Sequence, residues 1–269
     1  MDNVTQYNQE RWEMLARAGA LFTRPWLELD PDSARARLDP QGILGDVAHQ
    51  DVLCLAGGGG QQSSAFALLG ANVTVVDLSE SQLQRDREAA LHYGVKIETV
   101  QGDMRDLSRL GQAAFDIVWH PYSLNFVPNA RVVFREVARV LRPKGLYHFM
   151  CANPFACGLG SKDWDGNAYP LRLPYIDGAE ITYADEDWVF KDDKPHAIQG
   201  PREYRQTLSK LLNGLIEQGF VILHMEECTE YVPDAEPGTW DHFQSIVPPW
   251  LMFWAAYRPD ILADTHVPR

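Results

Sequence analysis

The stretch DVLCLAGGGGQQSSAFALLGANVTVVD, residues 51–77, decides the fold. Residues 52–55 form a short apolar run, which is typical of a strand buried on both faces of a parallel sheet, and four glycines at 57–60 end it. Small and apolar residues follow at helical spacing as far as Gly70, which suits a helix C-cap. Residues 73–76 are a second apolar, β-branched run that ends in Asp77. The stretch therefore predicts a strand, a glycine turn, a helix and a second strand.

The glycine turn and Asp77 together indicate a ligand site. Backbone without Cβ atoms can approach a ligand closely and can adopt positive φ angles. The start of the following helix favours a negatively charged group, and a carboxylate at the end of the neighbouring strand can accept both hydroxyls of a ribose. The alternative is that the glycines only make a tight turn and that Asp77 caps the next helix. The order of strand, turn, helix, strand and acid favours the ligand site.

The alternation of strands and helices continues beyond Asp77. The pattern predicts a helix at 79–93, a strand at 96–101 that leads into Gly102-Asp103-Met104, a strand at 115–119 that leads into His120-Pro121-Tyr122, a helix at 129–141 ended by 142–145, and a strand at 146–152. Strands and helices that alternate at this pitch imply a parallel sheet with right-handed crossovers.

Composition narrows the class of partner. The 269 residues carry a net charge of −13, so neither nucleic acid nor an anionic membrane is expected as the main partner. No apolar run approaches the roughly 18 residues of a membrane span. The four cysteines have no close-paired spacing and the histidines are scattered, which predicts reduced structural thiols, no metal site and a cytoplasmic protein.

Several motifs in this order resemble those of the class I S-adenosylmethionine-dependent methyltransferases. The motifs are VLCLAGGGG at 52–60, Asp77, GDM at 102–104, FDIVWHP at 115–121 and EVARVLRPKG at 136–145. The resemblance covers about residues 50–152 and implies a Rossmann-like, doubly wound, seven-stranded α/β sheet that is mostly parallel with an antiparallel last strand. One domain is expected, with a helical cap at 1–45, a cofactor-binding core at 46–152, a lid at 153–200, and a last helix and end strands at 201–269.

The resemblance also implies which residues hold the cofactor. Ala56, Gly57, Gly58 and Gly60 would wrap its methionine part, Asp77 would bind the ribose hydroxyls, Leu78 would cover one face of the adenine, Asp103 would accept from the adenine amino group, Met104 would pack on the ring, and His120 would line the site near the sulfonium. In the family, Ala56 is commonly the first glycine and Cys54 is commonly an acid. Carbonyl oxygens of the loop are therefore expected to hold the ammonium group.

Two other functions fit parts of the pattern. A NAD(P)-dependent oxidoreductase would also use a glycine turn and an acid after the second strand, although GDM and LRPKG belong to the methyltransferase pattern. A methyltransferase-like domain that binds a ligand without catalysis is the other alternative, because a fold alone does not establish an activity.

The acceptor is expected to be a small molecule held under the lid. Trp12, Tyr122, Trp164 and Tyr175 are the predicted acceptor-side residues. Aromatic and acidic residues alternate through 153–200, which suits a neutral or cationic acceptor such as an amine, unless the segment is a small hairpin with a solvated acidic face. Trp12 could instead pack its helix on the sheet. His120 is the candidate general base, and Pro201 is expected to open the last helix, which ends at Gly219.

Overall fold

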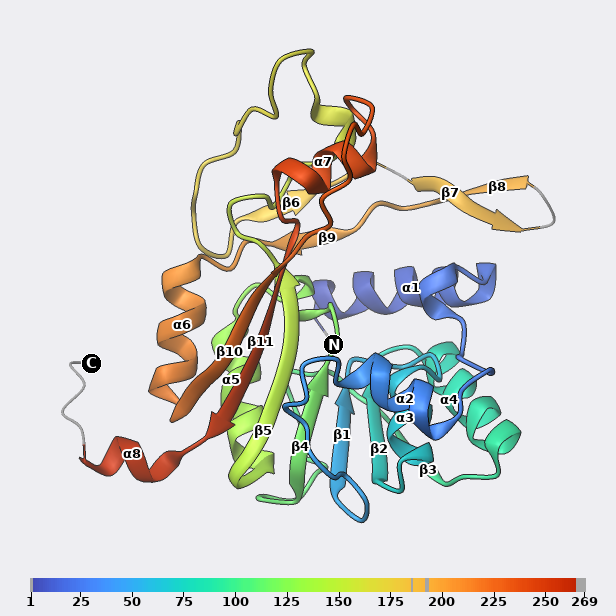
Figure 1. The fold of residues 1–269 in the computed structure, drawn as a ribbon, viewed down its shortest axis with the longest axis vertical. Helices are drawn as coiled ribbons and strands as arrows, with labels where there is room; N and C mark the ends of the chain where they lie inside the picture. Colours follow the sequence, from blue (N-terminus) through green and yellow to red (C-terminus); the bar gives the residue numbers. More distant parts are fainter. Residues whose placement is uncertain (1, 185, 192–193, 265–269) are drawn as a thin grey trace.

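A seven-stranded sheet forms the centre of the computed structural model, which describes residues 2–184, 186–191 and 194–264 (Figure 1). The order across the sheet is β10-β11-β5-β4-β1-β2-β3. β11 pairs antiparallel with both of its neighbours, and the other pairs are parallel, which confirms the predicted fold class. The strands are β1 (Asp51–Leu55), β2 (Asn72–Asp77), β3 (Ile97–Gln101), β4 (Phe115–His120), β5 (Leu141–Ala152), β10 (Phe220–Cys228) and β11 (Trp250–Tyr257).

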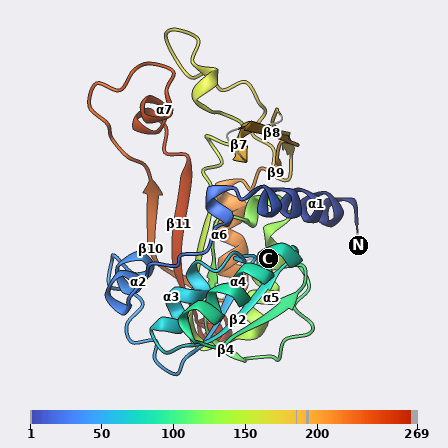
Figure 2. The ribbon, with the colours of Figure 1, turned by 90° about the vertical axis from the view of Figure 1, so that its right-hand side faces the viewer.

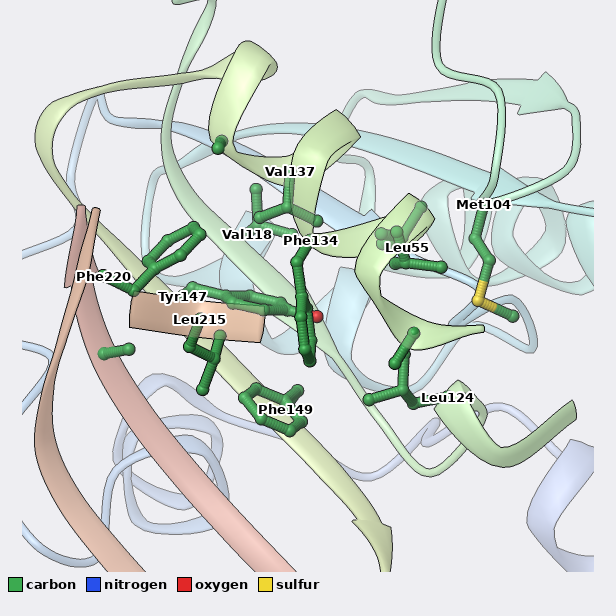
Figure 3. Close-up of a cluster of buried hydrophobic side chains, with 14 of the residues drawn as sticks. Leu55, Met104, Val118, Leu124, Phe134, Val137, Tyr147, Phe149, Leu215 and Phe220 are labelled. Atoms are coloured by element: carbon green, nitrogen blue, oxygen red, sulfur yellow. The ribbon is translucent and has the colours of Figure 1, made fainter. Parts of the chain in front are cut away.

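Helices cover both faces of this sheet because its strands are apolar on both sides. Along β1, Leu53 and Leu55 pack with α5 (Ala130–Val140) and α6 (Leu208–Glu217), whereas Val52 and Cys54 pack on the other face. Figure 3 shows the first of these clusters, in which Phe134 and Leu215 from the two helices meet Tyr147 and Phe149 of β5. The second face is covered by α2 (Pro31–Leu38), α3 (Gln62–Leu68) and α4 (Glu80–Tyr93).

Local signals explain where two of the helices begin and end. The Ser79 side chain accepts a hydrogen bond from the backbone N–H of Gln82 at the start of α4, and Gly94 ends the helix at φ 65°. The N-terminal helix, α1 (Asn3–Ala18), is capped in the same way by Asp2. Figures 1 and 2 show α1 lying across the carboxyl ends of the parallel strands, between the sheet and the hairpin of β7 (Glu186–Lys191) and β8 (Lys194–Ile198).

The fifth strand is longer than predicted. Residues 142–145 were expected to form a turn before it, but β5 begins at Leu141. Its register against β4 shifts from Phe115 paired with Leu141 to Ile117 paired with Leu146, so these four residues bulge out of the ladder. Arg142 holds the bulge by ion pairs to Asp51 and Asp116, at 2.8 and 2.7 Å. The predicted turn is therefore present as a bulge within the strand.

The helix expected from Pro201 begins later than predicted, and it is not the last one, because two short helices follow it. Pro201 was expected to open it, but residues Arg202–Tyr204 form a strand, β9, that pairs with β6 (Glu180–Thr182). The helix α6 starts only at Leu208, after Thr207. The side-chain oxygen of Gln206 accepts from the N–H of Ala130, which ties this connection to α5. Pairing with a distant segment thus overrides the local helix signal at Pro201.

Shorter elements complete the chain. They are η1 (Leu21–Thr23), η2 (Leu124–Phe126), η3 (Ser161–Asp163), α7 (Trp240–Ile246) and α8 (Pro259–Asp264). In the part of the chain that the structure describes, no helix has both the length and the apolar character needed to cross a membrane. The four cysteines are free, and Cys54 lies buried in β1.

Candidate functional site

A cavity of about 1090 Å³ lies at the carboxyl ends of the parallel strands. Its floor comes from the residues that follow β1 to β4 and from the end of β5, and α1 contributes part of its wall. Of the residues predicted from the sequence for the site, the cavity is lined by Trp12, Ala56, Gly57, Gly58, Asp77, Leu78, Asp103, Met104 and Tyr122. Residues from five separate parts of the sequence therefore meet in one place.

The glycine loop is held from behind by Asp86 of α4. The N–H groups of Gly59 and Gly60 each donate to its carboxylate at 3.0 Å, and the Ser63 hydroxyl donates to it as well. Gly60 has φ 69°, and a Cβ there would lie 2.7 Å from the carbonyl oxygen of Arg85. Gly60 thus permits close packing of the loop on α4 and does not line the cavity, although it was expected to contact the cofactor.

Asp86 was not predicted as part of the site. Burial raises the pKa of this carboxyl to about 7, while its three hydrogen bonds act in the opposite direction. The available signal was its position on the inward face of the predicted helix, together with the buried Gln82, Leu83 and Ala90. An acid at such a position needs buried donors, and the glycine loop supplies them.

Asp77 lies at the end of β2 with its carboxylate at the cavity. Oδ2 accepts from the N–H of Gly58 at 3.0 Å and Oδ1 accepts from the N–H of Ser79 at 2.9 Å. Burial raises the pKa of Asp77 to about 6. Beside it, the side chain of Gln82 lines the cavity, and its buried Oε1 accepts no hydrogen bond from the described residues. An orphaned acceptor next to a carboxylate suits a ligand that brings hydroxyl or ammonium donors.

Asp103 follows β3 and connects the cavity floor to α1. Its Oδ2 accepts from the Thr5 hydroxyl at 2.7 Å and pairs with the Arg105 guanidinium at 2.7 Å. Arg105 also pairs with Asp2, the cap of α1, at 2.8 Å. Although burial acts in the opposite direction, hydrogen bonds from Arg105 hold the pKa of Asp103 below its usual value. Thr5 and Arg105 were not predicted, and both line the cavity.

The remaining wall of the cavity is largely aromatic. Trp12 of α1 packs edge-on against Phe22 and Phe126, with ring centroids 5.7 and 5.8 Å apart. Further lining comes from Met150, Trp240, Phe243 and Trp250. Within this wall three polar side chains meet, because the Tyr122 and Tyr183 hydroxyls both donate to the buried carboxylate of Glu203.

His120, Trp164 and Tyr175 are not part of the cavity lining, contrary to the prediction. The His120 ring is fully buried beneath the floor, with Nδ1 2.9 Å from the Tyr147 hydroxyl, and burial lowers its pKa to about 3. Trp164 packs on His242, and Tyr175 stacks on Phe155 beside a separate cavity of about 410 Å³. The side chain of Trp188, another predicted lid aromatic, lies outside the described residues.

Comparison with known proteins agrees with this arrangement. The family model described as a methyltransferase domain matches residues 53–149. A crystal structure of an S-adenosylmethionine-dependent methyltransferase from Mesorhizobium loti has the same fold, with a TM-score of 0.59 and 24% identity over 86% of this chain and all of that one. The uncharacterized methyltransferase YbaJ from Bacillus subtilis (strain 168) is 35% identical over 68% of this chain and 70% of its own length. This chain belongs to the class I S-adenosylmethionine-dependent methyltransferases. A ubiquinone biosynthesis O-methyltransferase from Bordetella avium is also similar to it, at 34% identity over 52% of this chain and 60% of that relative.

The cofactor of this methyltransferase is S-adenosylmethionine, and the donors and acceptors of the cavity suit it. Asp77 and the orphaned Oε1 of Gln82 offer acceptors to hydroxyl groups, and the backbone at Ala56, Gly57 and Gly58 is open to the cavity. Met104 and Leu78 add apolar surface where a flat ring could lie. In the described part of the methyltransferase, no group of three or more His, Cys, Asp or Glu side chains is placed to hold a metal ion.

Proposed function

We propose that this methyltransferase methylates a hydroxyl or amino group of a small, largely apolar organic molecule. The observation that carries the proposal is the cavity of about 1090 Å³, which joins a polar side at Asp77 and Asp103 to an aromatic side at Trp12, Phe126 and Trp250. Ligand cavities usually measure about 300 to 1,000 Å³, so this one has room for a cofactor and a small acceptor together. The similarity to an O-methyltransferase from Bordetella avium supports a hydroxyl acceptor.

The proposed roles of the residues follow from their positions. Asp77 would accept the ribose hydroxyls, Asp103 would face the adenine, and the glycine loop would hold the methionine part. Bound S-adenosylmethionine supplies a methyl group already activated by a positive sulfur. The protein then has to align the acceptor with that methyl group and exclude water, which the aromatic wall suits.

Catalysis by His120 is not part of the proposal. Its ring is enclosed beneath the cavity floor, and its low pKa leaves it a poor proton acceptor at neutral pH. The amine acceptor that the composition of 153–200 suggested draws no added support from Trp164 and Tyr175, because both pack outside the cavity. Hydroxyl and amine acceptors are therefore tested side by side.

An activity screen tests the proposal. Purified protein is incubated with S-adenosylmethionine and panels of phenols, aliphatic alcohols, amines, nucleic acids and proteins, and formation of S-adenosylhomocysteine is measured. Methylation of small organic molecules is expected. Methylation confined to nucleic acid or protein would overturn the proposed acceptor class. Preferential binding of a nicotinamide dinucleotide in a parallel calorimetric titration would instead contradict the proposed use of the site.

A further inference from the structure

Among the described acids that line the cavity, Glu203 is the most buried one on the aromatic side, where we propose that the acceptor binds. It lies in β9, opposite Ile181 of β6, and the residue is 6% exposed although it lines the cavity. The Tyr122 hydroxyl donates to Oε1 at 2.7 Å and the Tyr183 hydroxyl donates to Oε2 at 3.0 Å. The carboxyl group is therefore held at both oxygens by residues that also line the cavity.

The direction of these hydrogen bonds follows from the backbone. The N–H of Ala152 donates to Oδ1 of Asn125 at 2.9 Å, so the amide nitrogen of Asn125 must point the other way. That nitrogen donates to the Tyr122 hydroxyl at 3.2 Å, which leaves the Tyr122 proton for Glu203. Similarly, the N–H of Gly158 donates to the Tyr183 hydroxyl at 3.1 Å. Both hydroxyl protons are thus committed to Glu203, which acts as the acceptor.

The arrangement leaves Glu203 with unused acceptor capacity. A carboxylate has about four lone-pair sites. The two tyrosine hydroxyls use two of them, and the Cys157 thiol, with Sγ 4.0 Å from Oε2, uses a third. Burial raises the pKa of Glu203, while the two tyrosines, Asn125 and the nearby charge of Arg11 act in the opposite direction. Burying a carboxylate costs free energy of folding, and a protein with apolar side chains of similar size in its place is often at least as stable. Packing alone therefore does not explain an acid at this position. The remaining lone pair, on Oε1, suits a ligand that brings its own donor.

We propose that Glu203 is a specificity-determining residue that accepts a hydrogen bond from a hydroxyl or ammonium group of the acceptor. This inference rests on the proposed small-molecule function and narrows its substrate class. Acceptors without a hydrogen-bond donor would leave the carboxylate short of partners, so the site discriminates against them. Tyr122 and Tyr183 act as positioning residues, because they fix the carboxylate at the cavity wall.

Glu180 provides a matched control. It is the other glutamate of the same two-stranded sheet, and it accepts a hydrogen bond from the Tyr204 hydroxyl at 3.2 Å. Its side chain is exposed and does not line the cavity. Glu180→Gln therefore repeats the chemical change of Glu203→Gln in the same small sheet without altering the cavity wall.

The experiment measures acceptor binding to the full-length protein saturated with S-adenosylhomocysteine. Calorimetry compares three probes of similar size: catechol, which carries hydroxyls; 2-phenylethylamine, which carries an ammonium group; and 1,2-dimethoxybenzene, which has no donor. The wild type is expected to bind catechol or 2-phenylethylamine at least about 10-fold more tightly than 1,2-dimethoxybenzene, and whichever binds tighter identifies the donor group. In Glu203→Gln this preference is expected to fall by roughly 10- to 100-fold, and Glu180→Gln is expected to behave as the wild type.

Two results would overturn the inference. One is equal binding of the three probes by the wild type, which decides the matter even if Glu203→Gln does not fold. The other is a folded Glu203→Gln variant that keeps the wild-type preference, since a purely structural Glu203 would change the melting temperature and not the preference. Failure of the wild type to bind S-adenosylhomocysteine in the first titration would instead refute the proposed function.

Discussion

Asp77 and Glu203 line the same cavity, but they are held by different means. Asp77 accepts from two backbone N–H groups, one of them only two residues away. Glu203 accepts from two tyrosine hydroxyls, of which Tyr122 is 81 residues away. Backbone donors are present whatever the side chains are, whereas each hydroxyl is lost in a single substitution. A single substitution can therefore remove part of the support of Glu203 more readily than that of Asp77.

The largest effect is expected on the cofactor side, from a substitution that removes the carboxylate holding the glycine loop. Asp86→Ala leaves the N–H groups of Gly59 and Gly60 and the Ser63 hydroxyl without their buried acceptor. We expect the free energy of unfolding to fall by about 3 to 5 kcal/mol, measured by urea denaturation. Asp106→Ala, at an exposed carboxyl, serves as the control. A loss no larger than that of the control would show that the loop does not depend on α4.

A second test compares how one substitution on each side of the cavity changes the affinity for S-adenosylmethionine. Asp77→Ala should weaken binding of S-adenosylmethionine by about 1.5 to 3 kcal/mol, or roughly 10- to 150-fold, since it removes hydrogen bonds to a charged acceptor. Glu203→Gln should leave this affinity unchanged, because its carboxylate is assigned to the acceptor. Isothermal titration measures both variants. Unchanged cofactor affinity in Asp77→Ala would remove Asp77 from the cofactor site.

The pH dependence of cofactor binding gives a smaller but specific effect. The pKa of Asp77 is raised to about 6, so the carboxylate that we propose accepts the ribose hydroxyls is lost as the pH falls through that value. The affinity for S-adenosylmethionine should therefore be constant above pH 7 and should fall about 10-fold per pH unit below pH 6. Titrations between pH 5 and 8 measure it. In Asp77→Asn, which has no carboxyl to titrate, a slope as steep as that of the wild type would assign the effect to another group.

The smallest effects are expected from alanine substitutions of two tryptophans, one inside and one outside the cavity lining. Trp12 lines the cavity from α1, the helix that Thr5 ties to Asp103 at the proposed cofactor side. Trp12→Ala should therefore weaken cofactor binding by about 3- to 10-fold, the worth of one or two aromatic contacts, with a smaller effect on stability. Trp164 packs on Tyr169 and His242 outside the cavity, and Trp164→Ala should change the affinity less than about 2-fold. If Trp12→Ala lowers the melting temperature strongly in the free and the saturated protein while the affinity stays intact, Trp12 belongs to the core.

The sheet and much of the cofactor side could be predicted because their signals are local. β1 and β2 are short apolar runs on either side of a glycine turn, and Asp77 follows the second run directly. His120 also stood at the expected end of its strand, but its ring turns beneath the floor and not into the cavity. A residue's place along a strand is readable from the sequence, whereas the packing that decides the surroundings of its side chain is not.

Trp12 and Tyr122 were predicted and line the cavity, but Glu203 could not be predicted, because its position depends on pairing between distant segments. Residues 202–204 follow a proline that favours a helix start, and only their contact with 180–182 makes them a strand. That pairing carries Glu203 to Tyr122 and Tyr183. Asp86 and Arg105 were missed for a related reason, since their importance comes from groups they meet across the fold.

The ion pairs of Arg105 with Asp2 and Asp103 also bear on how quickly the cavity exchanges its contents. They tie the first turn of α1 to the floor, and the Asp2 side chain is 56% exposed, so dissolved salt reaches the outer pair. Raising the ionic strength from 0.01 to 1 M shortens the range of such attractions from about 30 to about 3 Å. Dissociation of S-adenosylhomocysteine, followed by stopped-flow displacement, should therefore become faster as salt is added. The rate of product release would then depend on the ion pairs that hold the start of α1 against the cavity floor.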